Sequence, residues 1–228
     1  MSYKDLSDWM GQVEEMGELK RFSGVHWNLE QGAICDMAMR EMQIPPALLF
    51  EDIPDYPKGM RSLWGQISSM KRLALTMNLS TEQESVMGFV RQVREKLANL
   101  KPIPAISREN GPVTENMKKG DEVDAEIFPS PFIHARDGGR YFGTASLVIT
   151  RDPDEGWVNL GTYRCMLHDK RSVGIYTLPG KHGWIHLQKY KERKEHCPAA
   201  VVVGADPGLY LAGSMEVPWG MTEYDYAG

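Results

Sequence analysis

The strongest restriction on the fold is a break near the middle of the chain, at residues 101–104, where the sequence reads Lys-Pro-Ile-Pro. A helix cannot continue through this segment, because proline lacks an amide hydrogen and its ring clashes with the preceding turn. From there to about residue 120 the chain is polar and rich in turn residues. The break predicts two domains, over residues 1–110 and 111–228.

Helices and short strands alternate before the break. Apolar residues at helical spacing predict helices, and short apolar runs predict strands. The predicted helices cover residues 6–16, 34–42 and 86–97, and the predicted strands cover residues 18–22, 47–50 and 60–64. A capping box at Thr81-Glu82-Gln83-Glu84 is expected to begin the third helix. This alternation predicts a mixed α/β domain.

Longer strands follow the break. Residues 141–150 and 157–166 have the composition of strands, and a strong turn signal separates them. The next expected elements are a strand at 171–178, a charged surface helix at 183–195, a buried strand at 199–205 and a short helix beginning at 207–212. Consecutive strands of this kind predict an antiparallel sheet or barrel with a few helices, so the fold class is α+β.

Charge and cysteine content exclude several classes of function. The formal net charge is −5, from 26 basic and 31 acidic residues, which argues against non-specific binding to nucleic acid. Cys35, Cys165 and Cys197 are far apart in the sequence, which argues against a disulfide framework and a thiolate zinc site. No apolar run approaches the roughly 18 residues of a membrane helix, and the N-terminus lacks the apolar core of a signal peptide. We expect a protein of the reducing cytoplasm that binds no membrane.

The first candidate cluster is the segment 159–164, Asn-Leu-Gly-Thr-Tyr-Arg. On one continuous strand, Asn159 and Tyr163 share a face and Arg164 lies on the other. An inward Arg164 needs an anionic partner, and a phosphate or carboxylate suits its planar fork. The spacing alone favours a surface arginine in a surface salt bridge, by about two to one.

The second cluster lies where the segment 179–183 enters the surface helix. Amides at a helix start favour anions, and Lys181 adds positive charge, so a phosphate is one candidate ligand beside His182. His182 and His186 are also spaced like zinc ligands, but Gly183 occupies the position of the glutamate in the zinc motif HExxH. We interpret His186 as a solvated residue at a helix end.

The third cluster combines the small residues of segment 211–218 with Glu223. Small residues allow the backbone to approach a ligand closely, and a carboxylate is a hard oxygen donor for Mg²⁺ or Mn²⁺. A single glutamate in a loop is usually only a solvated charge. The three clusters together are consistent with a divalent metal that bridges to a phosphate.

Longer motifs resemble the UbiD-type decarboxylases over nearly the whole chain. They lie at residues 5–21, 48–57, 136–141 and 148–153. The most specific match combines Asn159 and Arg164 with His182, Met215 and Glu223. The resemblance implies an N-terminal α/β domain, followed by the first part of a split β-barrel that binds prenylated flavin mononucleotide (prenylated FMN).

The resemblance also assigns roles to individual residues. Asn159, His182 and Glu223 match residues that hold Mn²⁺ or Mg²⁺ against the flavin phosphate. The positions that match cofactor contacts are Asn159, Thr162, Tyr163, Arg164, Lys181, His182, Ser214, Met215 and Glu223. Those that match K⁺ contacts, mostly through the main chain, are Leu160, Ala212, Gly213, Met215 and Glu223. Gly213 stands where some family members have serine, so only its carbonyl is expected to make a contact.

The implied reaction is the reversible decarboxylation of aromatic or α,β-unsaturated acids. Arg164 is expected to face the substrate carboxylate and to pair with a catalytic glutamate. The acid/base residues of family members lie beyond the position that matches Gly228, in chains about twice this long. A flavin prenyltransferase is the implied supplier of the cofactor, and a homo-oligomer formed through the C-terminal region is the implied assembly.

Three explanations of the length stay open: a fragment, a split protein whose other half is a second polypeptide, or a reduced relative. We favour the fragment, and we expect the isolated chain to be unstable or to associate, because an incomplete barrel exposes strand edges and apolar faces.

Two alternative functions also stay open. One is a non-catalytic flavin- or phosphate-binding subunit or interaction module that lacks the acid/base residues. The other is a zinc hydrolase that uses His182 and His186. Within the leading hypothesis, cinnamate-like, hydroxybenzoate-like and heteroaromatic substrates are all compatible with the sequence.

Overall fold

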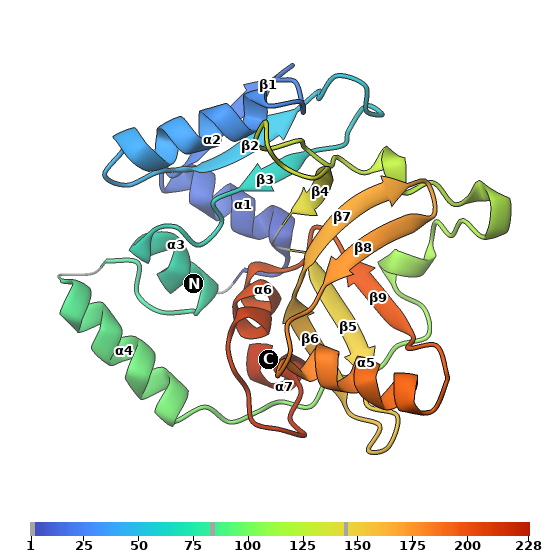
Figure 1. The fold of residues 1–228 in the computed structure, drawn as a ribbon. Helices are drawn as coiled ribbons and strands as arrows, with labels where there is room; N and C mark the ends of the chain where they lie inside the picture. Colours follow the sequence, from blue (N-terminus) through green and yellow to red (C-terminus); the bar gives the residue numbers. More distant parts are fainter. Residues whose placement is uncertain (1–2, 83–84, 144–145) are drawn as a thin grey trace.

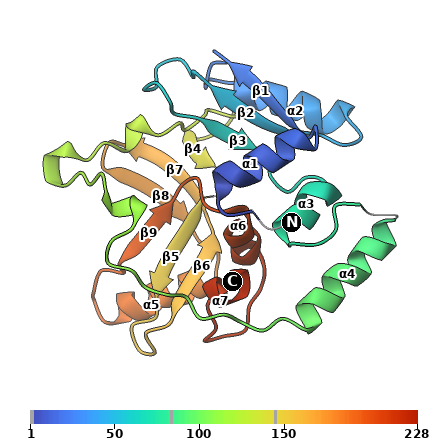
Figure 2. The same ribbon diagram turned by 180° about the vertical axis from the view of Figure 1, so that it is seen from behind.

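The structure is a computed structural model that describes residues 3–82, 85–143 and 146–228. Two regions of different construction lie side by side in it (Figures 1 and 2). The first contains α1 (Leu6–Glu15), β1 (Leu19–Ser23), α2 (Glu30–Glu41), β2 (Ala47–Glu51), β3 (Ser62–Trp64), α3 (Met70–Thr76) and α4 (Val86–Ala98). The second contains β4 (Arg140–Gly143), β5 (Leu147–Arg151), β6 (Val158–Thr162), β7 (Arg164–Asp169), β8 (Ser172–Tyr176), α5 (His182–Glu192), β9 (Ala199–Val202), α6 (Pro207–Ser214) and α7 (Glu223–Ala227).

The first region is built around a three-stranded sheet in the order β1-β2-β3. β1 and β2 are parallel and are connected through α2, whereas β3 runs antiparallel to β2. Successive residues of β2 face opposite sides: Leu49 packs with α1, and Leu48 and Phe50 pack with residues of α2. A strand covered on both faces reads as a continuous apolar run, which explains the sequence Ala-Leu-Leu-Phe.

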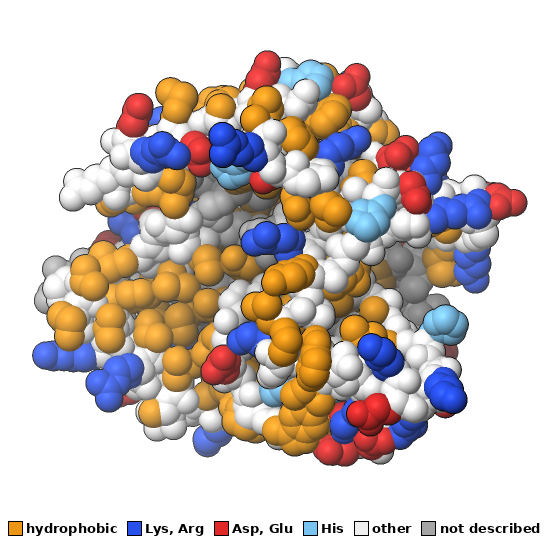
Figure 3. Space-filling view, in the orientation of Figure 1, with side chains coloured by type: hydrophobic (Ala, Val, Ile, Leu, Met, Phe, Trp, Pro, Cys, Tyr) orange, Lys and Arg blue, Asp and Glu red, His pale blue; other side chains and the backbone are white. Residues whose placement is uncertain are grey.

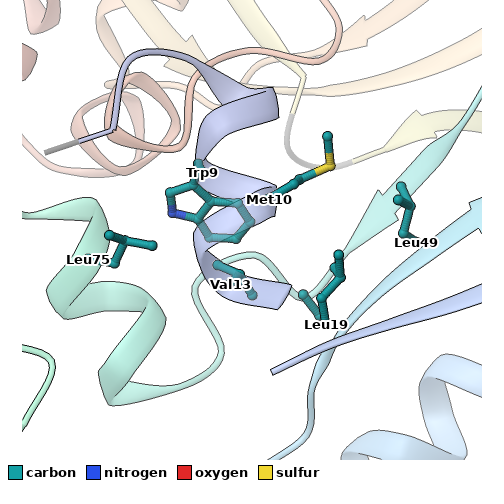
Figure 4. Close-up of a cluster of buried hydrophobic side chains, with 7 residues drawn as sticks. Trp9, Met10, Val13, Leu19, Leu49 and Leu75 are labelled. Atoms are coloured by element: carbon teal, nitrogen blue, oxygen red, sulfur yellow. The ribbon is translucent and has the colours of Figure 1, made fainter. Parts of the chain in front are cut away.

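Helix α1 supplies most of the core on one side of this sheet. Asp5 caps the helix by accepting a hydrogen bond from the backbone N–H of Asp8, and Trp9 and Val13 are fully buried. Figure 4 shows Trp9 and Val13 of α1 between Leu75 of α3 and the strands. The seven-residue α3 is absent from the sequence prediction. Its helical residues alone span only about two turns, which is too short for a clear periodicity.

The second region contains two antiparallel sheets, in the orders β4-β7-β8 and β6-β5-β9. The α+β fold class is confirmed, and within the described residues the two sheets do not close into a barrel. The prediction of single strands at 141–150 and 157–166 is wrong, because each segment forms two strands that belong to different sheets. The second division falls at Tyr163, whose N–H turns back to the carbonyl of Gly161 at 3.1 Å.

Two further expectations differ from the structure. The strand expected to be buried at 199–205 is shorter, and Ala199 and Ala200 are exposed, because β9 pairs on one side only, with β5. The capping box includes residues 83–84, which lie outside the described residues. The cap that the structure does describe is Ser85, whose side chain accepts a hydrogen bond from the N–H of Gly88.

Residues 99–139 connect the two regions and contain only three short 3₁₀ turns. The domain boundary between residues 110 and 111 stays a prediction. Several large apolar side chains are exposed on α4, and Figure 3 shows hydrophobic side chains gathered over the part of the surface where α3 and α4 lie. Among the described residues, no helix is long and apolar enough to cross a membrane.

Candidate functional site

A cavity of about 310 Å³ opens where β6, the start of α5, the loop after α6 and the start of α7 meet. The three clusters selected from the sequence converge on this cavity. Its lining includes Asn159, Leu160, Thr162, Tyr163, Lys181, His182, Gly213, Ser214, Met215 and Glu223. Of the other predicted residues, Ala212 lies beside a neighbouring cavity of about 760 Å³, which Met215 also lines. The roles of these residues stay predictions.

Glu223 is a buried carboxylate in the cavity wall, with 3% of its surface exposed. Its Oε2 accepts a hydrogen bond from the N–H of Leu160 at 2.7 Å, which ties the start of α7 to β6. Desolvation raises the pKa of Glu223, and the hydrogen bond from Leu160 only partly offsets this effect. A cation at this carboxylate offsets the cost of burying its charge, so the group fits a metal ligand.

Asn159 is a second buried polar group of the wall. Only 2% of its surface is exposed, and its Nδ2 makes no hydrogen bond to any of the described residues. Buried amide groups almost always have partners, so an unpartnered one calls for a ligand. A phosphate oxygen can accept from Nδ2, and the amide oxygen can ligate a hard cation.

Lys181 and His182 bring positive charge and an imidazole to the same cavity. His182 is the first residue of α5, and Lys181 is its N-cap residue. Burial, followed by the nearby charge of Lys181, lowers the pKa of His182, so the neutral form that ligates metals is favoured. Lys181 Nζ lies 3.0 Å from Glu216 Oε1 in an exposed ion pair. The first turn of an α-helix also presents backbone N–H groups that suit an anion.

Tyr163 fixes the distance between β6 and α5. Its hydroxyl accepts a hydrogen bond from the N–H of Gly183 at 3.1 Å. A Cβ atom on Gly161 would meet the Tyr163 ring at 2.7 Å, and one on Gly183 would meet it at 2.8 Å. Both positions therefore require glycine as long as the tyrosine is present. The backbone of Gly213 approaches β6 similarly, because a Cβ there would lie 3.2 Å from the Leu160 carbonyl oxygen.

Arg164 does not line the cavity. Its side chain is exposed at the start of β7, opposite Tyr176 on β8. The exposure agrees with the favoured interpretation of a surface arginine. The alternative, an inward Arg164, is wrong: it assumed one continuous strand through residues 159–164, but β6 ends before Tyr163. The predicted role of Arg164 toward a substrate carboxylate stays a prediction.

The interpretation of His186 as a solvated residue is wrong. His186 is fully buried within α5; its Nδ1 lies 2.9 Å from Thr150 Oγ1, and its Nε2 lies 3.6 Å from Asp152 Oδ2. It does not line the cavity that contains His182. Among the described residues, no three His, Cys, Asp or Glu side chains are grouped to hold a metal. The pair required by the zinc-hydrolase alternative therefore has no third ligand of these types there.

Two tryptophans that lie beside the cavity were not predicted from the sequence as site residues. Trp157 and Trp219 both make edge-to-face contacts with His182, with ring centroids 5.2 Å and 5.3 Å away. Trp219 lies between Met215 and Glu223 in the sequence, and that position was the available signal. An isolated tryptophan in a loop gives no periodicity that marks it as part of a site.

The cavity is built from one edge strand and two helix starts of an α+β fold, and its lining combines a buried carboxylate, a buried amide, an imidazole and a lysine. Two family models match the chain. The 3-octaprenyl-4-hydroxybenzoate carboxy-lyase N-terminal domain matches residues 10–87, and the Rift-related domain of the same carboxy-lyase matches residues 105–228. The chain belongs to the UbiD family, as its motifs predicted.

Similar proteins include characterised decarboxylases. A pyrrole-2-carboxylic acid decarboxylase of Pseudomonas aeruginosa is 33% identical over 98% of this chain and 46% of its own length. The closed form of vanillic acid decarboxylase of Sedimentibacter hydroxybenzoicus superposes with a TM-score of 0.89 at 27% identity, over 100% of this chain and 48% of that one. An evolved dimeric form of HmfF from Pelotomaculum thermopropionicum, solved with prFMN, superposes with a TM-score of 0.82 at 26% identity, over 98% of this chain and 49% of that one. The chain spans about half the length of these relatives.

Proposed function

We propose that the protein takes part in the reversible, non-oxidative decarboxylation of aromatic or α,β-unsaturated carboxylic acids, with prenylated FMN and Mn²⁺ or Mg²⁺ as cofactors. The observation that carries the proposal is the convergence of Asn159, His182 and Glu223 on one cavity at the start of α5. Membership of the UbiD family supports it, as does the prFMN named for one structural relative.

In this proposal each wall of the cavity has a separate task. Asn159, His182 and Glu223 would hold the divalent metal, which would supply positive charge for the phosphate of the flavin. Lys181 and the first amides of α5 stabilise the negative charge of that phosphate. K⁺ would be held by main-chain groups of Leu160, Ala212, Gly213 and Met215, together with Glu223. Thr162, Tyr163 and Ser214 complete the wall against the cofactor.

Prenylated FMN, when bound, supplies the electron-accepting chemistry of the decarboxylation. The exposed guanidinium of Arg164 binds and orients the substrate carboxylate by a bidentate contact. We assign no acidic residue of this chain as the proton donor: Glu223 accepts from Leu160, and Glu216 is paired with Lys181. The proposal includes a flavin prenyltransferase as cofactor supplier, a homo-oligomer, a cytoplasmic location and domains at residues 1–110 and 111–228.

A second candidate is a flavin- or phosphate-binding subunit without catalytic activity. It is favoured by the observation that both carboxylates lining the cavity already have a partner, Leu160 N–H for Glu223 and Lys181 for Glu216. Activity distinguishes the two functions. Supplying the C-terminal half of a relative should restore decarboxylation only if this chain contributes catalytic residues such as Arg164.

The first test is the cofactor content of the chain after co-expression with a flavin prenyltransferase in the presence of Mn²⁺ and K⁺. Absorbance and native mass should report one prenylated flavin per chain, and His182→Ala or Glu223→Ala should abolish it. His134→Ala is the matched control, because His134 is an exposed histidine that does not line the cavity. Retention of the flavin by Glu223→Ala overturns the proposed metal site.

A further inference from the structure

The loop that joins α6 to α7 carries a tryptophan that the proposed function does not use. Trp219 lies four residues after Met215 and four before Glu223, and 44% of its surface is exposed. An exposed tryptophan in a loop usually has few fixed contacts. Trp219 instead contacts three rings: Trp157 at 5.1 Å, His182 at 5.3 Å and His186 at 6.3 Å, all edge-to-face. Such edge-to-face pairs contribute stabilisation beyond that of the area they bury.

A hydrogen bond and a cation–π contact also hold the same indole. Its Nε1–H donates to Glu155 Oε1 at 3.4 Å, and Lys189 Nζ lies 5.2 Å from the ring centroid in a cation–π contact. Lys189 is itself fixed, because its Nζ lies 2.6 Å from the buried carboxylate of Asp152. The indole is therefore attached to the turn before β6 and to α5.

Asp152 is the buried group to which these contacts of Trp219 are connected. It is 1% exposed, and its Oδ1 accepts hydrogen bonds from the N–H groups of Asp154 and Glu155. The turn that carries Glu155 and the lysine that contacts Trp219 are thus both bound to one buried carboxylate. Trp219 is the part of the α6–α7 loop that reaches this anchor.

We propose that Trp219 is a positioning residue that holds the α6–α7 loop, and with it Glu223, at a fixed distance from His182. This inference rests on the proposed function, since it treats His182 and Glu223 as ligands of one metal ion. The two ligands are 41 positions apart in the sequence and belong to different helices. Trp219 packs directly on the His182 ring, so it couples the two helix starts. Loss of such a supporting contact typically weakens metal binding about 10- to 100-fold.

The test measures Mn²⁺ binding to the full chain in the presence of FMN, by electron paramagnetic resonance of free Mn²⁺. Trp219→Leu should weaken Mn²⁺ affinity at least about tenfold. Trp219→Phe keeps an aromatic ring against His182, although a smaller one, and loses the hydrogen bond to Glu155, so it should recover most of that affinity. Phe128→Leu is the control for loss of a half-exposed aromatic pair, because Phe128 contacts Phe142 and does not line the cavity.

The outcomes separate the two proposals. If the unmodified chain binds no Mn²⁺ with FMN, the proposed metal site fails and this inference fails with it. If the unmodified chain binds Mn²⁺ and Trp219→Leu binds it equally well, this inference alone is overturned. Melting curves by circular dichroism, with metal absent, check that Trp219→Leu folds. An equal loss of affinity in Phe128→Leu would assign the effect to general destabilisation and also overturn the inference.

Discussion

The core around α1 and the cavity at the start of α5 differ in how fully their buried polar groups are hydrogen-bonded. In the first, the Trp9 indole N–H donates to Thr76, and the buried guanidinium of Arg72 binds Glu18 and two backbone carbonyls. In the second, Asn159 has an unpartnered donor, and burial raises the pKa of Glu223. The hydrogen bonds of the first arrangement involve no ligand, whereas the second contains groups that a bound ligand would stabilise.

The contrast is one of degree. Gln31 and Gln66, in the first region, also have a buried oxygen without a partner among the described residues. The unpartnered atoms of Trp157, Asn159 and His186 differ in lying near one another: Trp157 directly precedes β6, which contains Asn159, and its ring contacts His186 of α5. Of these three residues, only Asn159 lines the cavity of about 310 Å³.

The largest expected effect is on the first core. Trp9→Ala removes a fully buried indole and should lower the free energy of unfolding by about 3–5 kcal/mol. Thr76 Oγ1 also loses the hydrogen bond donated by the Trp9 indole, although it still donates its own to the Arg72 carbonyl. Urea unfolding followed by circular dichroism measures the change. A loss below about 1 kcal/mol would contradict the tight packing inferred for this core.

Glu223→Gln should separate stability from binding. Burial raises the pKa of Glu223 above its ordinary value of 4.5. As pH rises above 4.5, the carboxyl therefore ionises in the unfolded chain before it ionises in the folded one. The metal-free protein loses stability over this range, until the folded carboxyl is ionised too. Glutamine removes this cost and keeps an acceptor for Leu160. At pH 7 and without metal, the variant should unfold at a temperature equal to or above that of the unmodified chain, while its Mn²⁺ affinity falls at least about tenfold.

A lower melting temperature of the metal-free Glu223→Gln variant would contradict that prediction. It would mean that the charge of Glu223 stabilises the fold without a cation. The complementary experiment adds Mn²⁺ and FMN to the unmodified chain, which should then melt at a higher temperature by linkage.

Asp152→Asn is expected to have a smaller effect that depends on pH. Burial raises the pKa of Asp152, but the hydrogen bond from Lys189 and those from two backbone amides outweigh it and hold the pKa at about 2. The stabilisation is therefore complete above the ordinary value of 3.8 and is lost as pH falls from there toward 2. Melting temperatures of variant and unmodified chain should differ at pH 6 and converge toward pH 2, and a constant difference would contradict this.

The smallest effect is expected at the surface of the cavity. Lys181→Ala breaks an exposed ion pair with Glu216, and such pairs contribute about 0–1 kcal/mol. The free energy of unfolding should change by less than about 0.5 kcal/mol. Affinity for FMN should nevertheless fall, and its dependence on salt should weaken, because one positive charge near the phosphate is lost. Fluorescence titration at two salt concentrations provides the measurement.

The sequence predicted the first region better than the second because its signals are local. The continuous apolar run of β2 and the spacing of Trp9 and Val13 on α1 follow directly from the faces that each element buries. The corner at Tyr163 was not predictable from strand composition, since the residues on both sides of it favour strands. The burial of His186 depends on Thr150 and Asp152, which approach it only after β5 and α5 have packed.

The candidate site was predicted by motif resemblance, and spacing alone could not bring its parts together. Asn159, His182 and Glu223 lie on three different elements, and only the fold shows that they share one cavity. Trp219 had no motif to mark it. Its position is determined by Lys189 and Glu155, two charged residues that look like ordinary surface groups in the sequence.

The close contact of Tyr163 with two glycines also has an evolutionary consequence. A side chain at Gly161 or Gly183 collides with the ring, so these three positions cannot drift independently. A lineage that replaces the tyrosine by a small residue gains freedom at both glycines at once, and a lineage that keeps it should keep both. Correlated change at the three positions in related sequences would be a historical record of the same packing constraint.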